Sequence, residues 1–350
     1  MRKERLYGAA GCAALILAAC GGGHDHGQGQ GFTPIPPSWA PVSLLTLSDA
    51  ERELANISTT LALTDPSTVA PAAAAAPMTR ALGPDHALVR GFAPAAAAQP
   101  RAMPMPRVTD ANCTAGGNDA VTSSSKSRAF SYFTLTATVN YTVDAYSNCA
   151  NSSNGTTTTR DGLFESGVTT DSVYQYQALG DLNSGNTLAV FSDGPDANNN
   201  PLHTQQDFLG LLEAGSSGSL LDQRSNLFST LFASQPNQPD YDGSFQIGDS
   251  GGVYEIISSG TSLNIGGTYA YASTACLGGA VTVTTPTNLG LGTTSAGSGL
   301  PVSGVLSIDS GSNSVSYSFN ADGSATLSGS VSGTISAADV GRILQNGTSC

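Results

Sequence analysis

Two short loops concentrate the oxygen-bearing side chains that a calcium ion prefers. Calcium takes about six to eight oxygen ligands, and glycine helps such loops to bend. Neither loop has the spacing of an EF-hand, and Asp, Asn and Gly are also the usual residues of solvated turns. We therefore expect no cofactor to be required and keep calcium as an optional ligand. The candidate ligands are Asp193, Asp196 and Asn198 in one loop and Asp240 and Asp242 in the other.

A candidate nucleophile lies in the sequence Gly248-Asp249-Ser250-Gly251-Gly252. This segment resembles the nucleophile region of trypsin-like serine proteases, where the serine and adjacent backbone amides form the oxyanion hole. The resemblance implies a histidine base, but the expected folded domain contains only His203, whose neighbours are unlike those of the family's base. We therefore interpret residues 248–252 as a glycine-rich turn between two strands, and no enzymatic activity is predicted.

Paired carboxylates offer a different chemistry. A glycosidase-like site needs two carboxyl groups about 5–10 Å apart in a cleft. The sequence does not show which acidic side chains meet, so a hydrolase of an envelope polymer or glycan is the alternative function. The acidic residues available to it include Asp161, Glu165, Asp171, Glu213 and Glu255.

Two pairs of tyrosines stand at strand spacing, Tyr174 with Tyr176 and Tyr269 with Tyr271. Residues two apart on a strand share one face, so each pair places two rings side by side. Such rings can stack on a sugar or a peptide, but they also serve as ordinary cross-strand packing. Both interpretations stay open at this point.

The first twenty residues have the layout of an export signal. A charged start, Met1 to Arg5, precedes an apolar run of 14 residues from Leu6 to Ala19. That run is short for a helix that must cross about 30 Å of hydrocarbon. Leu17-Ala18-Ala19-Cys20 resembles the lipobox of bacterial lipoproteins. The resemblance implies cleavage before Cys20, lipid attachment at Cys20 and, because Gly21 follows, the outer membrane, with the chain facing the periplasm or the cell surface.

The segment after Cys20 changes character several times. Residues 20–47 are rich in Gly, Gln and Pro and predict a flexible tether. Residues 48–63 predict an isolated amphipathic helix, with Ser48 and Glu51 as its capping box. Residues 64–107 are rich in Ala and Pro and predict a semi-stiff spacer.

Residues 108–350 predict an antiparallel β domain, either a β-sandwich or a small β-barrel with a few short helices. Residues 131–143 alternate apolar and polar side chains, which is typical of a half-buried strand. Asn320-Ala321-Asp322-Gly323 predicts a hairpin turn. A capping box at Ser336 and Asp339 predicts a C-terminal helix. Apolar residues between 219 and 233 predict an inserted amphipathic helix.

The composition limits the partners. The full chain has 13 basic and 26 acidic residues, and removing the three basic and one acidic residue of the signal leaves 10 and 25, a net charge of −15. Such a surface repels phosphate backbones, so no nucleic-acid partner is expected.

Four cysteines remain after Cys12 and Cys20, which is typical of two disulfides in an exported chain. Adjacent pairing, Cys113 with Cys149 and Cys276 with Cys350, is favoured. We therefore predict a lipid-anchored lipoprotein of the cell envelope with a non-enzymatic binding or structural role. Its partners are the membrane, through the lipid, and an envelope protein or glycan.

Overall fold

The computed structural model describes residues 35–64, 113–153, 155–195, 199–274 and 278–346. Within them the chain is mainly antiparallel β structure with two helices. The fold class predicted from the sequence is therefore confirmed. Cys20 and the rest of the predicted export signal lie outside the described residues. Among the residues that the structure describes, no helix is both long and apolar enough to cross a membrane.

The strands run in chain order between the two helices. Their bounds are α1 Leu47–Thr64, β1 Gly116–Phe130, β2 Leu135–Ser153, β3 Thr156–Thr169, β4 Tyr174–Leu179, β5 Leu188–Pro195, β6 Pro201–Ser217, β7 Leu220–Ser234, β8 Tyr241–Ile247, β9 Tyr254–Ser259, β10 Ser262–Ser273, β11 Gly279–Thr294, β12 Gly297–Ser310, β13 Asn313–Phe319, β14 Ala325–Gly329, β15 Gly333–Ile335 and α5 Ala337–Asn346.

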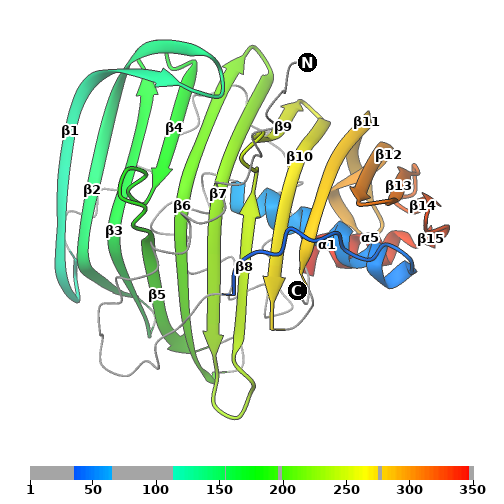
Figure 1. Cartoon of the computed structure of the whole chain (residues 1–350), viewed down its shortest axis with the longest axis horizontal. Helices are drawn as coiled ribbons and strands as arrows, with labels where there is room; N and C mark the ends of the chain where they lie inside the picture. Colours follow the sequence, from blue (N-terminus) through cyan, green and yellow to red (C-terminus); the bar gives the residue numbers. More distant parts are fainter. Residues whose placement is uncertain (1–34, 65–112, 154, 196–198, 275–277, 347–350) are drawn as a thin grey trace, which may run out of the picture.

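All the strands belong to one 15-stranded antiparallel sheet (Figure 1). The main order follows the chain from β1 to β15, while β5 pairs with β3 and β6, and β9 pairs with β7 and β10. Most neighbours are joined by turns, as expected for antiparallel strands. The turn at 320–323 was predicted correctly, because Asn320 closes it onto Ser324 and Gly323 has a φ of 87°.

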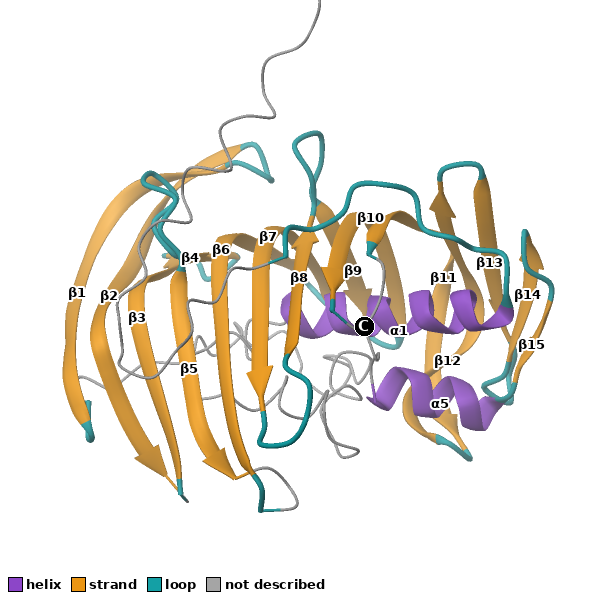
Figure 2. Ribbon diagram, turned by 60° about the horizontal axis from the view of Figure 1, so that its bottom comes forward, coloured by secondary structure: helices purple, strands orange, loops and turns teal. Residues whose placement is uncertain are grey.

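The sheet curves around α1, which crosses the strands on the inner face (Figure 2). Ala50, Leu54, Ile57 and Leu61 share one side of this helix and are buried in the main hydrophobic core. The sequence predicts an amphipathic helix over 48–63 and leaves its packing partner open. In the structure that partner is the sheet itself, which begins more than 50 residues later in the chain.

Glu53 on α1 is fully buried and is the polar centre of this contact. Its carboxylate accepts hydrogen bonds from the hydroxyls of Tyr271 at 2.6 Å and Tyr269 at 3.0 Å, both on β10. Asn56 and Arg52 donate to it from the helix. A buried carboxylate is tolerated only with such partners, so these donors fix α1 against the sheet.

Two more tyrosines of the sheet hold the same helix. The Tyr317 hydroxyl donates to the backbone oxygen of Ala50 at 2.7 Å, and the Tyr254 and Thr60 hydroxyls are 2.9 Å apart. Burial raises the pKa of both tyrosines above the ordinary value. Each hydroxyl therefore stays protonated and available for these hydrogen bonds.

The helix caps show how local sequence sets the ends. Thr46 and Asp49 form a reciprocal capping box at the start of α1, with Thr46 Oγ1 accepting from the Asp49 amide and Asp49 accepting from the Thr46 amide. The predicted box at Ser48 and Glu51 was therefore placed two residues too late. At α5 the predicted box is confirmed, because the Asp339 amide donates to Ser336 Oγ.

The predicted helix over 219–233 was wrong, because these residues form β7. β7 pairs with β6 on one side and with β8 and β9 on the other. A central strand carries apolar side chains on both faces, so neighbouring pairs such as Leu227-Phe228 and Leu231-Phe232 mimic helical spacing. Pairing with neighbouring strands, which the local sequence does not show, makes this segment a strand and not a helix.

The disulfide predicted between Cys113 and Cys149 is confirmed, with a Cα–Cα distance of 5.0 Å. It ties the residues that precede β1 to β2, and Cys149 is buried in the main core. The second predicted pair, Cys276 with Cys350, lies outside the described residues.

Replacing Glu53 by Gln tests the contact between α1 and the sheet. The amide is isosteric but lacks the charge that two tyrosines, Asn56 and Arg52 satisfy. We expect the free energy of unfolding to fall by about 1.5–3 kcal/mol, the range for hydrogen bonds to a charged group. Denaturant melts measure the change.

The control is Glu51→Gln, since Glu51 is only half-buried on the same helix. That variant should stay within about 0.5 kcal/mol of the unmodified protein. Equal losses in the two variants would mean that Glu53 does not hold the helix.

Candidate functional site

A depression in the described part of the chain lies at one end of β5, β6 and β7. Its volume is about 660 Å³, and its lining includes Asp193, His203 and Ser234. Ligand pockets of about 300–1,000 Å³ with a few convergent polar groups are typical of small-molecule sites. This depression is therefore the candidate functional site.

Strand pairing sets the geometry of the depression. Asp193 on β5 lies opposite His203 on β6, and His203 lies opposite Ser234 on β7. Residues directly opposite in an antiparallel pair point to the same face. The three polar side chains therefore form a row across three neighbouring strands.

The histidine in this row is held by its carboxylate neighbour. His203 Nδ1 lies 2.7 Å from Asp193 Oδ1. A carboxylate only accepts hydrogen bonds, so Nδ1 carries the proton and donates it. The ring also meets Phe232 edge-on, with centroids 6.2 Å apart. These two contacts hold the ring in place.

The remaining walls are stiff and partly apolar. Pro195 and Pro201 form the last pair of the β5–β6 ladder, and Pro236 follows the end of β7. Proline fixes its own backbone, so these walls keep their shape without a ligand. The side chains of His203 and Asp193 are 42% and 65% exposed, which makes the site open to solvent.

The calcium interpretation gains no support from this geometry. Asp193 is engaged by His203, whereas Asp240 directly precedes β8 and Asp242 lies at its start, three strands along the sheet from β5. Asp196 and Asn198 lie outside the described residues. Within the described ranges, no group of three or more His, Cys, Asp or Glu side chains is arranged to hold a metal ion.

Residues 248–252 form a turn between β8 and β9, as predicted. The Asp249 amide donates to the Gly252 oxygen, and the Asn226 side chain donates to the Asp249 oxygen. Asn226 lies eight residues along β7 from Ser234, the residue opposite His203, which is about 27 Å at about 3.4 Å per residue. Ser250 and His203 are therefore not brought together as a nucleophile and base.

Tyr174 and Tyr176 lie in a second, smaller aromatic cluster on the other face of the sheet. Phe130 and Phe133, from the end of β1 and the turn after it, pack on their rings. Tyr176 is 1% exposed. The Arg128 guanidinium covers its ring at 3.6 Å. The tyrosine pair therefore packs the β1–β2 hairpin onto the sheet and does not present two exposed rings to a ligand.

Tyr269 and Tyr271 are also buried, because they hold Glu53 in the main core. The sequence placed the two rings on one face correctly. That face is the inner one, covered by α1, so neither ring is open to a ligand.

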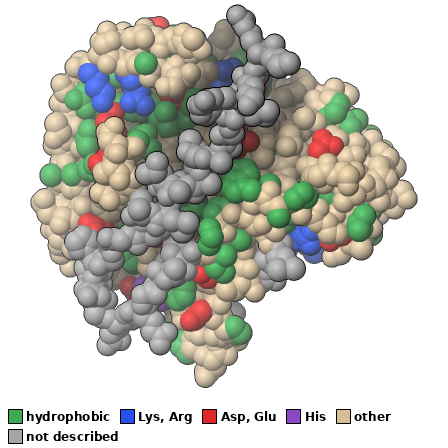
Figure 3. Space-filling view, viewed as in Figure 1, with side chains coloured by type: hydrophobic (Ala, Val, Ile, Leu, Met, Phe, Trp, Pro, Cys, Tyr) green, Lys and Arg blue, Asp and Glu red, His purple; other side chains and the backbone are tan. Residues whose placement is uncertain are grey.

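Acidic side chains near the hairpin are paired with donors. Glu165 accepts from Lys126 at 2.7 Å and from the Tyr176 hydroxyl. Figure 3 shows basic side chains beside hydrophobic ones at the upper left, in the region of β1 and β2. Glu213 is 1% exposed and accepts the backbone N–H groups of Ser131 and Tyr132.

The other carboxylates that a hydrolase would need are engaged in similar ways. Arg224 lies opposite Glu213 and pairs with Glu255 at 2.9 Å. Asp171 accepts from Thr169 and the Val173 amide within a turn, and these hydrogen bonds lower its pKa. Asp161 stands apart on β3, opposite Ala189. These contacts suit structural roles for the paired carboxylates.

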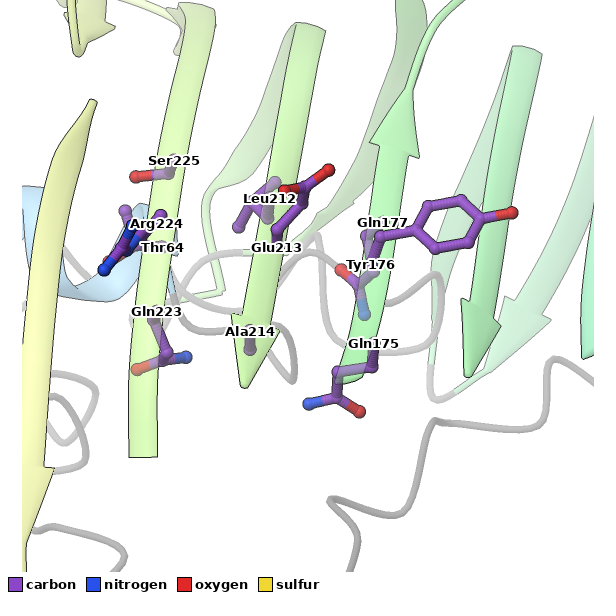
Figure 4. Close-up of a pocket in the computed structure, with 10 residues that line it drawn as sticks. All are labelled: Thr64, Gln175, Tyr176, Gln177, Leu212, Glu213, Ala214, Gln223, Arg224 and Ser225. Carbon is purple, nitrogen blue, oxygen red and sulfur yellow. The ribbon is translucent and has the colours of Figure 1, made fainter. Parts of the chain in front are cut away.

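A second pocket lies where α1 ends, beside Thr64 (Figure 4). Gln175 and Gln177 reach it from β4, and Gln223 and Ser225 from β7. Its volume of about 20 Å³ leaves room for about one water molecule. This pocket is too small for an organic ligand and is not a candidate site.

One signal in the sequence could have revealed the Asp193–His203 pair. A hairpin centred on residue 198 pairs residues whose numbers add to 396, which includes 193 with 203 and 195 with 201. The turn residues between 193 and 200 are typical of such a hairpin, and this pairing brings Asp193 and His203 together.

Comparison with known protein families, with curated proteins and with solved structures finds no match to this chain. The candidate site therefore stands on its own geometry.

A buried acidic pair on β1 and β2 gives a prediction about pH. Asp144 is 1% exposed, and among the described residues neither of its carboxylate oxygens has a hydrogen-bond partner. Burial, with the charge of Asp119 nearby, raises the pKa of Asp144 to about 6. An acid with a raised pKa in the folded state loses stability as pH rises from about 4 to about 6.

We expect Asp144→Asn to raise the free energy of unfolding at pH 7.5 by about 1–3 kcal/mol. Its stability should also depend less on pH between about 4 and 6. Urea melts across this range measure both effects. Asp309→Asn, on an exposed strand position, is the control and should change little. A destabilised Asp144→Asn protein at pH 7.5 would contradict the analysis.

Proposed function

We propose that this chain is a lipid-anchored lipoprotein of the bacterial cell envelope that binds a small ligand without catalysis. The observation that carries the proposal is the depression of about 660 Å³ around the Asp193–His203 pair. It combines the size of a ligand site with a histidine whose orientation is already fixed, which lowers the entropic cost of binding.

The distribution of charge supports binding rather than acid–base catalysis. Glu165, Glu213 and Glu255 each accept hydrogen bonds or ion pairs. A general acid or base needs a proton that it can exchange with a substrate. The hydrolase alternative would therefore have to break contacts that hold the hairpin and the strands in place.

The proposed location of the protein in the cell rests on the sequence Leu17-Ala18-Ala19-Cys20. One acyl chain binds a membrane marginally, whereas two or more hold it firmly. Thioether lipid at Cys20, with a further acyl group on the new amino terminus, supplies that anchor. The β domain then stands in the envelope, in the periplasm or on the surface of the outer membrane.

Mass spectrometry of the protein purified from its native membrane tests the anchor. We expect the N-terminal peptide to begin at Cys20 and to carry the mass of acyl chains. Cys20→Ala should abolish both cleavage and lipidation. Cys12→Ala, in the same signal, is the matched control and should change neither. A mature chain with an unmodified Cys20 would contradict the proposed anchor.

A second experiment tests the site. The purified protein is incubated with a small-molecule extract of the envelope, and the retained compounds are measured by mass spectrometry. His203→Trp should fill the depression and lower retention at least tenfold, roughly 1.4 kcal/mol. Ser250→Trp, in the turn after β8, is the control for added bulk. Equal retention by both variants would remove the depression from the proposed function.

A further inference from the structure

We propose that residues 35–47, the entry segment that leads into α1, are a membrane-contact surface. Its exposed Trp39, Leu45 and Leu47 side chains rest on the phospholipid bilayer that holds the anchor. The inference rests on the proposed function, because it takes the bilayer from the proposed lipid at Cys20. It concerns a surface separate from the depression around His203.

Exposed apolar side chains gather in the entry segment. In the described part of the chain six large hydrophobic side chains are exposed, and three of them lie within residues 39–47. Trp39 is 50% exposed, Leu45 64% and Leu47 41%. Single exposed apolar residues are ordinary, but a group of them marks contact with another molecule or with a membrane. The entry segment is the dark blue trace that leads into α1 in Figure 1.

The sheet holds the entry segment from its inward side. The Ala280 amide on β11 donates to the Ala40 oxygen at 2.8 Å. The Val42 amide donates to Ser310 Oγ on β12, also at 2.8 Å. The side chains of Val42 and Leu44 are buried in the main core. The outward side chains therefore stand on a backbone that is already ordered, which lowers the entropic cost of a contact.

The exposed side chains have the chemistry of a bilayer interface. Tryptophan is enriched where hydrocarbon meets water, because its ring is apolar and its indole N–H still reaches a polar partner. Residues 27–48 contain no Asp, Glu, Lys, Arg or His. No charge within this stretch has to leave water when the entry segment meets lipid, and moving a charge out of water would be costly.

The proposed anchor keeps the bilayer close to the entry segment. Trp39 follows Cys20 by 19 residues, which span at most about 65 Å when fully extended. Such a link makes contact with the membrane an intramolecular event at a high effective concentration. A few apolar side chains are therefore enough, although they would hold an unanchored protein weakly. A separate protein partner has no such advantage, so the chain length favours the bilayer as the occupant.

The charge of the chain favours one class of lipid. After the predicted cleavage, 10 basic residues stand against 25 acidic ones. Anionic headgroups repel such a chain within about one Debye length, whereas zwitterionic headgroups do not. We therefore expect the contact on zwitterionic phospholipid, with apolar insertion and not charge attraction as its driving force.

Trp39 is the only tryptophan of the chain, so its fluorescence reports on the entry segment alone. The protein purified from its native membrane is reconstituted into phosphatidylcholine vesicles whose acyl chains carry bromine, with unbrominated vesicles as the blank. We expect the brominated lipid to quench Trp39 emission at least twofold. Replacing part of the phosphatidylcholine by phosphatidylglycerol should weaken the quenching at low salt.

A pair of double variants separates the entry segment from exposed leucines elsewhere. Leu45→Ser with Leu47→Ser should lower the quenching at least twofold, because membrane binding scales with the apolar area buried. The matched control is Leu182→Ser with Leu220→Ser, whose leucines are 47% and 40% exposed. That pair should leave the quenching unchanged. Circular dichroism checks that both variants keep the fold.

The inference is overturned if brominated lipid leaves Trp39 emission unchanged, or if both double variants lose quenching equally. Trp39 emission that responds to envelope proteins and not to brominated lipid also overturns it, since the occupant is then a protein. Failure here is distinguishable from failure of the proposed function. Acyl mass at Cys20 with unquenched Trp39 discards the membrane contact and keeps the anchor, whereas an unmodified Cys20 removes both.

Discussion

The buried carboxylate of Glu53 is the contact on which the arrangement of this chain depends. Removing such a charge from water costs several kcal/mol, and only well-placed donors offset that cost. Tyr269 and Tyr271 on β10 supply two of the donors. Only the position in which α1 lies across β10 satisfies Glu53, so the carboxylate specifies where the helix sits. Apolar burial alone is non-directional and would not fix this position.

A second buried carboxylate stabilises the opposite side of the sheet. Glu213, almost fully buried, accepts the backbone amides of Ser131 and Tyr132, which hold the turn between β1 and β2. Arg224 donates to the Tyr132 oxygen and covers the Phe133 ring at 4.6 Å. The chain has few charged residues, and several of them lie inside the molecule. Only 11% of the residues are charged, and Ser, Thr, Asn and Gly supply much of the remaining polar character of the chain.

Period-two alternation and turn residues made the β class, the turn at 320–323 and the C-terminal capping box predictable from the sequence. These features depend on neighbours within a few residues. β7 was missed because a strand buried on both faces loses its alternation. The packing of α1 on the sheet could not be predicted, because its partners on β10 lie more than 200 residues away in the sequence. The same limit applies to the site. The sequence identifies Asp193 and His203 as separate candidates, but it does not show the strand register that pairs them.

The contacts that stabilise the fold and the residues of the candidate site lie on different strands of the sheet. α1 packs on the inner face of the sheet through tyrosines of β9, β10 and β13, whereas Asp193 and His203 stand at the ends of β5 and β6. The residues just before α1 also pair with the sheet, since the Ser38 amide donates to the Tyr271 oxygen and the Val42 amide donates to Ser310 Oγ. A site placed away from these contacts can stay open to solvent without endangering the fold.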